Sequence, residues 1–304
     1  MDLLQEMNFN EVVVQKLSDE YLTDQCIELS VLRLDGIHPV VSGNKWFKLK
    51  YYLQKAIEKN YSSIGTFGGA FSNHILATAY ACNKQNLQCT GFIRGEAATN
   101  LSETLLDAQS LNMRLEFVSR AGYKNKQAIQ NANLSMFFIP EGGYGETGAK
   151  GASEILQLVP NLSIYHYIVC AVGTGTMLAG ITNAALPHQQ NIGISVMKNN
   201  NSLESEMKFL VNKEAQSHVQ LLHDYHFGGY AKFTHDLIDF MNKQWTIHHL
   251  PLDLVYTAKA FYAIYDLADK KYFADKANIL FIHSGGLQGN RSLKKGTLCT
   301  NQTI

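Results

Sequence analysis

The chain has 304 residues, 46% of them hydrophobic and 17% charged, and its 26 lysines and arginines balance its 26 aspartates and glutamates. This length predicts about two domains, and the composition can bury a sizeable core. Zero net charge argues against a nucleic-acid partner, because such proteins usually carry a basic excess. The absence of an apolar run of about 18 residues argues against a membrane-spanning helix.

The cysteines and the N-terminus indicate the compartment. The five cysteines are scattered and form no CxxC pair, so the sequence predicts neither a metal site such as zinc nor a disulfide framework. The first ten residues, MDLLQEMNFN, are interrupted by acids and are not typical of a signal peptide. We therefore expect a cytoplasmic protein with reduced, mostly buried thiols.

Short apolar segments alternate with longer amphipathic ones along the chain. The predicted strands are 63–67, 88–93, 114–118, 136–139, 167–172, 192–196 and 279–283. Examples of predicted helices between them are 45–58, 72–85, 102–111, 147–158, 176–185 and 202–211. This alternation predicts an α/β protein with parallel sheets. In such sheets, ligands bind where the carboxyl ends of strands lead into loops.

Three predicted strands end in glycine-rich loops, 68–74, 173–176 and 284–289. Glycine lets the backbone approach a ligand closely, and a following helix offers free N–H groups to an anion. The loop Gly173-Thr174-Gly175-Thr176 is the best phosphate candidate, although a tight turn with nothing bound remains an alternative. It is neither a dinucleotide fingerprint nor a Walker A loop. A compact phosphate on a small cofactor fits it better.

A pyridoxal 5′-phosphate (PLP) enzyme needs a lysine that condenses with the cofactor aldehyde. The segment 43–50 offers three. Lys45 follows the turn signal Gly43-Asn44, where the helix dipole and burial against Trp46 would disfavour the charged amine. Lys48 and Lys50 lie further round the predicted helix and could be ordinary solvated charges. Spacing alone does not single out Lys45, because most lysines lie on the surface.

Several motifs, in order along most of the chain, resemble those of the D-cysteine desulfhydrase / 1-aminocyclopropane-1-carboxylate (ACC) deaminase family. They are Arg33, Asp35, His38-Pro39, Ser42-Gly43-Asn44-Lys45 and Lys48-Leu49, then Gly68–His74, Pro140–Gly143, Gly173–Thr176, Leu252–Ala260 and His283–Gly289. The resemblance implies a PLP enzyme of fold type II, like the tryptophan synthase β-subunit. It implies two three-layer α/β/α domains with mostly parallel sheets and PLP in the cleft between them.

The resemblance also implies a role for each matching residue. Lys45 matches the Schiff-base lysine, Asn73 the residue that binds the phenolic oxygen of PLP, and Ser72 a serine that contacts the substrate carboxylate or moves protons. Tyr256 and Tyr230 match active-site tyrosines. The phosphate loop matches Gly173, Thr174, Gly175 and Thr176.

Two positions bear on the reaction. In the ACC deaminases of this family, a glutamate follows the tyrosine and a leucine follows the last histidine, whereas this chain has Thr257 and Ser284. A hydroxyl such as Ser284 need not protonate the pyridine nitrogen, so a β-leaving group could depart readily. We therefore expect α,β-elimination of D-cysteine to pyruvate, ammonia and hydrogen sulfide. Alternatives are ACC deamination to 2-oxobutanoate, a related D-amino-acid lyase or racemase, and a non-catalytic α/β binding protein.

The resemblance implies a larger PLP-binding domain, residues 1–47 plus 159–304, and a smaller α/β domain, residues 48–158. Lys45 would lie at the junction, and closure of the cleft would exclude water. We expect a homodimer that acts on a small amino acid, and we expect residues 223–251 to build part of the substrate pocket.

Overall fold

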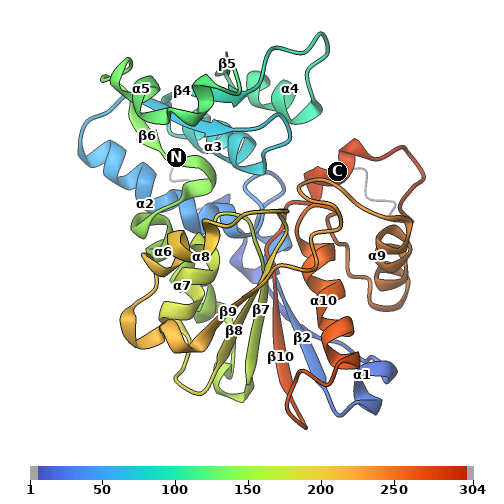
Figure 1. Ribbon diagram of the computed structural model, residues 1–304. Helices are drawn as coiled ribbons and strands as arrows, with labels where there is room; N and C mark the ends of the chain where they lie inside the picture. The colour runs from blue at the N-terminus through green and yellow to red at the C-terminus, as the bar shows by residue number, and fades with distance from the viewer. Residues whose placement is uncertain (1–5, 300–304) are drawn as a thin grey trace.

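The computed structural model describes residues 6–299, which form two separate sheets flanked by helices (Figure 1). The larger sheet has the strand order β1-β2-β10-β7-β8-β9. Its strands are β1 Val14–Lys16, β2 Glu28–Arg33, β7 Tyr167–Val172, β8 Gln190–Ser195, β9 Val219–Leu222 and β10 Asn278–His283. The smaller sheet has the order β5-β4-β3-β6. Its strands are β3 Ser63–Gly68, β4 Gln88–Arg94, β5 Met113–Val118 and β6 Phe137–Ile139.

All neighbouring strands pair in parallel except β1 and β2, which are antiparallel. Helices cover both faces of the larger sheet, with α10 on one side and α7 with α6 on the other (Figure 1). The helices are α1 Glu20–Asp24, α2 Asn44–Glu58, α3 Asn73–Lys84, α4 Glu103–Ser110, α5 Lys126–Asn131, α6 Glu146–Ser153, α7 Thr176–Ala184, α8 Leu203–Lys208, α9 His235–His248 and α10 Thr257–Asp269.

The central strand β10 shows why the larger sheet is buried on both faces. Ile279 and Phe281 pack in the cluster that contains α10, whereas Leu280 and Ile282 pack in the cluster that contains α7. Successive side chains of a strand point to opposite faces, so a continuous apolar run needs helices on both sides.

The fold class is confirmed, and every predicted strand and helix is present within a few residues. The predicted helix 147–158 divides into α6 and a 3₁₀ turn, Glu154–Leu158. The prediction did not name β1, β2, β9, α1, α5, α9 or α10. The smaller sheet lies inside the predicted smaller domain, but α6, which is in the same predicted segment, packs against α7. The exact domain boundary stays a prediction.

Two other expectations concern membrane-spanning helices and the cysteines. Across residues 6–299, no helix is both long enough and apolar enough to span a bilayer. Three of the cysteines, Cys82, Cys89 and Cys170, are buried, whereas Cys26 and Cys299 are exposed, and all five are unpaired.

Candidate active site

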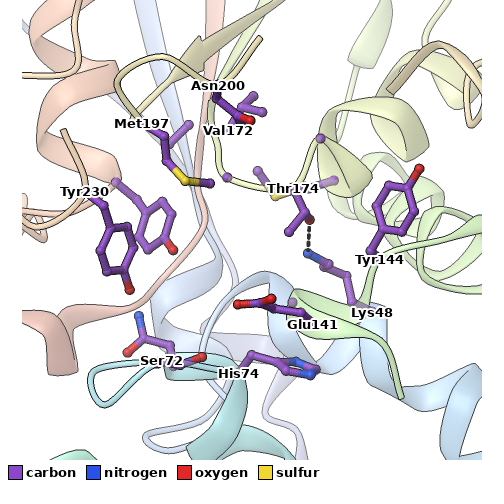
Figure 2. Close-up of a pocket in the computed structure, with 18 of the residues that line it drawn as sticks. Lys48, Ser72, His74, Glu141, Tyr144, Val172, Thr174, Met197, Asn200 and Tyr230 are labelled. Carbon is purple, nitrogen blue, oxygen red and sulfur yellow. Dashed lines mark hydrogen bonds between the residues drawn. The ribbon is translucent and has the colours of Figure 1, made fainter. Parts of the chain in front are cut away.

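A cavity of about 790 Å³ lies between the two sheets, at the carboxyl ends of β3, β7 and β10 (Figure 2). The three glycine loops that the sequence singled out therefore converge there. Of the predicted site residues, the cavity is lined by Lys45, Ser72, Asn73, Gly173, Thr174, Gly175, Tyr230, Tyr256 and Ser284. Thr176 is fully buried and does not line the cavity.

Glycine at position 43 places Lys45 beside the loop after β10. Gly43 has a φ of 63°, and a Cβ there would lie 1.8 Å from the carbonyl oxygen of Ser284. No other residue fits this approach. The backbone N–H of Asn44 donates to the same carbonyl over 3.2 Å. The first turn of α2 is therefore held directly against Ser284.

The amine of Lys45 is set up for nucleophilic chemistry. Its Nζ donates to Asn44 Oδ1 at 2.6 Å. Burial lowers the pKa of Lys45 to about 8, although the nearby Asp253 carboxylate acts in the opposite direction. The direction agrees with the depression that the sequence predicts, and burial is its main cause. About a tenth of the amine is thus neutral at pH 7.

The turn Gly173–Thr176 leads from β7 into α7. Gly175 has a φ of 77° and precedes the first helical residue, Thr176. The hydroxyls of Thr174 and Thr176 lie 3.1 Å apart. The buried Thr176 is therefore within hydrogen-bond distance of Thr174. The free N–H groups of the first turn of α7 lie next to the cavity.

Lys48 is buried, whereas the sequence suggested that it could be a solvated charge. It is only 5% exposed and lines the cavity. Its Nζ lies 3.5 Å from Thr174 Oγ1, the contact drawn in Figure 2. Burial, with repulsion from Lys45, holds the pKa of Lys48 well below its usual value. The spacing of three residues from Lys45, which puts both on one face of a helix, could have revealed it.

Lys50 is not solvated either. Its side chain is mostly buried and forms an ion pair with Glu154. It is not among the residues that line the cavity.

The start of α3 brings three further polar residues to the cavity. Ser72 caps the helix, and its Oγ accepts from the Ile75 N–H at 3.4 Å. Asn73 Oδ1 is buried and has no hydrogen-bond partner among residues 6–299. His74 was not predicted to have a role; its Nε2 lies 2.8 Å from Thr66 Oγ1, and burial holds its pKa well below the usual value. His74 is therefore a neutral imidazole.

The two predicted tyrosines lie together on the larger-sheet side of the cavity. The rings of Tyr230 and Tyr256 meet edge to face, with centroids 6.1 Å apart. Tyr230 points into the cavity opposite Lys48 and Thr174 (Figure 2). Burial is the main cause that raises the pKa of both phenols. Both are therefore neutral O–H donors at physiological pH.

Thr257 and Ser284 are the two hydroxyl residues that distinguish this sequence from the ACC deaminases it resembles. They lie in different environments. Thr257 is fully buried, and its Oγ1 donates to Asp253 Oδ2 at 2.7 Å. Asp253 also accepts from the backbone N–H groups at the start of α10. Only Ser284 lines the cavity.

These residues fit PLP. Lys48 is a buried amine with no carboxylate within ion-pair distance among the described residues, and it lies beside the glycine-threonine turn. A phosphate group would supply the missing negative charge. The unpartnered amide oxygen of Asn73 marks a second place where a polar group of a ligand would bind.

Comparison with known proteins also indicates a PLP-dependent enzyme. The profile of the family "Pyridoxal-phosphate dependent enzyme" matches residues 22–285. A Thermotoga maritima protein named "Putative 1-aminocyclopropane-1-carboxylate deaminase" is 30% identical over 91% of this chain and 93% of its own length. A crystal structure of an ACC deaminase homologue superposes with a TM-score of 0.79 at 27% identity, covering 92% of this chain and 90% of the other.

A more distant structure agrees in fold alone. A hydrogen sulfide-producing enzyme from Fusobacterium nucleatum has a TM-score of 0.66 at 14% identity, with 94% of this chain and 98% of the other covered. The chain therefore belongs to the pyridoxal-phosphate-dependent enzyme family, in the fold type II group of ACC deaminase and D-cysteine desulfhydrase relatives, and is a PLP-dependent lyase or deaminase.

Proposed function

We propose that this enzyme catalyses α,β-elimination from a small amino acid with a good β-leaving group, and that D-cysteine is its first candidate substrate. One observation carries the proposal. The only one of the two distinguishing hydroxyls that faces the cavity is Ser284, whereas Thr257 is bound to Asp253. A glutamate, as in the ACC deaminases that the sequence resembles, is absent from position 257.

The proposal follows from what the residues can do. PLP, when bound, supplies an aldehyde that takes up the substrate amine and a ring that withdraws electrons from its α-carbon. Lys45, with its depressed pKa, would hold the cofactor and then accept the α-proton on Nζ. Ser72 and Asn73, at the start of α3, would bind the substrate carboxylate and the phenolic oxygen of the cofactor. Lys48 and the turn Gly173–Thr176 would bind the phosphate.

The hydroxyl of Ser284 favours elimination over reactions that need a stronger electron sink. A carboxylate beside the pyridine nitrogen would keep that nitrogen protonated, whereas a serine hydroxyl has no charge with which to do so. Ser284 would therefore supply no charge to strengthen the electron withdrawal by the ring, which would favour loss of a thiolate from the β-carbon. Tyr230 or Tyr256, both neutral phenols, would donate a proton to the departing sulfur.

The names of the relatives favour a second candidate, deamination of ACC to 2-oxobutanoate and ammonia. ACC has no leaving group, so its ring must open, and the same two tyrosines could act as acid, base or nucleophile there. A related lyase or racemase that acts on D-serine or β-chloroalanine is a third candidate. The predicted homodimer and cytoplasmic location stay predictions.

One substrate panel separates the candidates. The purified holoenzyme is incubated with D-cysteine, L-cysteine, ACC, D-serine and β-chloro-D-alanine, and sulfide, pyruvate and 2-oxobutanoate are quantified. We expect sulfide and pyruvate in equal amounts from D-cysteine. Rapid formation of 2-oxobutanoate from ACC, with little sulfide from D-cysteine, would overturn the proposal in favour of the second candidate.

A variant of Lys45 tests whether this residue is the lysine that binds PLP. Lys45→Ala should lose the visible absorption band of lysine-bound PLP and all turnover, while circular dichroism shows a folded protein. Lys55→Ala, in the same helix but exposed, should keep the band. Retention of the band in Lys45→Ala would move the attachment point to Lys48.

A further inference from the structure

The turn that presents Tyr230 to the cavity has a strained backbone. Four of its residues have positive φ angles: Phe227 at 50°, Gly228 at 92°, Gly229 at 119° and Ala231 at 54°. Bulky L-residues rarely adopt this region, and such strain persists only where the surroundings enforce it. Gly228, Gly229 and Tyr230 all line the cavity. Something outside the turn must therefore hold it in place.

The contact that holds it is a buried lysine on α10. Lys259 is fully buried, and its Nζ donates to the carbonyl oxygens of His226, at 2.9 Å, and Gly229, at 2.7 Å. No carboxylate within residues 6–299 forms an ion pair with it. A buried ammonium without a counter-ion is costly, and its two carbonyl partners offset only part of that cost.

The other contacts of the turn are weaker or local. The His226 ring accepts from the Gly228 N–H at 3.0 Å, and the Gly229 N–H donates to the His226 carbonyl at 2.9 Å. The Phe227 ring packs edge to face on Tyr262, also on α10. Lys259 joins the start and the middle of this segment to α10 by hydrogen bonds, at the carbonyl oxygens of His226 and Gly229.

Helix α10 contributes contacts that position both Tyr230 and Tyr256. Tyr256 immediately precedes α10 and is held by the cap that Asp253 forms there. Lys259 lies three residues further along and reaches the turn that carries Tyr230. The edge-to-face pair of the two rings is thus set by neighbouring contacts at one helix end.

We infer that Lys259 is a positioning residue, which holds the 226–231 turn so that the hydroxyl of Tyr230 is directed into the cavity. Lys259 itself does not touch the cavity, and it acts through the two carbonyl oxygens. The inference rests on the proposed function only in giving Tyr230 a part in turnover; the effect on the turn itself is independent of the substrate.

The test compares Lys259→Met with a matched control. Methionine keeps the unbranched, apolar part of the side chain and removes both hydrogen bonds. Gln189→Leu is the control, because Gln189 is also fully buried and its Nε2 also donates to two backbone carbonyls, those of Leu162 and Tyr165. It lies just before β8, at the end of the sheet away from the cavity.

The first readout is amide hydrogen exchange of the holoenzyme. We expect exchange in residues 226–231 to rise at least about tenfold in Lys259→Met, with β7 and β10 unchanged. Gln189→Leu should leave this segment as in the wild type. Wild-type exchange at 226–231 in Lys259→Met would overturn the inference, whatever the substrate. Lys259→Gln, which keeps two donors on a shorter chain, replaces Lys259→Met if the latter does not fold.

The second readout is a double-mutant cycle on the substrate found by the panel. Lys259→Met should lower kcat by about 10- to 100-fold with little change in KM and with the PLP absorption band retained. Tyr230→Phe should also lower kcat. The kcat of the double variant should be no lower than that of the less active single variant. Fully multiplicative losses would refute the action through Tyr230. If no substrate is turned over, the proposed function fails while the exchange result still decides the inference.

Discussion

Replacement of Lys45 by methionine should make the cofactor-free protein more stable at neutral pH, even though it removes the attachment point for PLP. Burial lowers the pKa of Lys45 from 10.5 to about 8, and each pKa unit corresponds to about 1.4 kcal/mol. The charged amine therefore destabilises the folded state by about 3 kcal/mol at pH 7. Loss of its hydrogen bond to Asn44 offsets about 1 kcal/mol, which leaves a net gain of about 2 kcal/mol.

The sign of this effect fixes its pH dependence. Because the folded-state pKa lies below the unfolded-state value, the unfolded chain binds more protons between about pH 8 and pH 10.5. The stability of the wild type therefore rises with pH through this window. The advantage of Lys45→Met should shrink to about zero by pH 10.

Urea unfolding of the cofactor-free proteins at pH 7 and pH 10 measures both effects. Lys55→Met is the control, because Lys55 lies in the same helix but is exposed, so its replacement should change the free energy of unfolding by less than about 0.5 kcal/mol. The reasoning fails if the wild type is as stable as Lys45→Met at pH 7. It also fails if the difference between them is the same at both pH values.

Three further variants probe the neighbouring contacts. Lys48→Met should raise the Kd for PLP at least about tenfold, measured by fluorescence titration, because it removes the buried amine beside the phosphate turn. Thr257→Val should lower the free energy of unfolding by about 1–3 kcal/mol, measured in urea, because Asp253 loses the buried hydroxyl that donates to it. Arg291→Ala breaks an ion pair with Asp107 that joins the two halves of the molecule; stability should fall by less than about 1 kcal/mol, while PLP should dissociate faster in stopped-flow exchange.

The sequence was informative where local rules and tertiary structure agree. The apolar strands that end in glycine loops are clear because parallel strands must be buried on both faces. Their loops meet because the carboxyl ends of parallel strands lie at one edge of a sheet. The strand Tyr167–Val172 and the start of α7 at Thr176 were predicted as observed.

Several of the elements that were missed have weaker local signals. Strands β1 and β9 are only three and four residues long, so periodicity cannot identify them. Helix α10 is buried over most of its surface. Its less buried stripe, Tyr262, Tyr265, Asp266 and Asp269, is half aromatic, so its polar face is narrow.

The family and its cofactor were determined by the sequence itself, because motif residues in a fixed order specify them. The environment of each lysine was decided only by the tertiary structure. Lys45 and Lys48 face a cavity formed by strands far apart in the chain, and Lys259 reaches a turn 30 residues before it. The cost of burying a charge depends on all the groups that surround it in space, and no local pattern contains them.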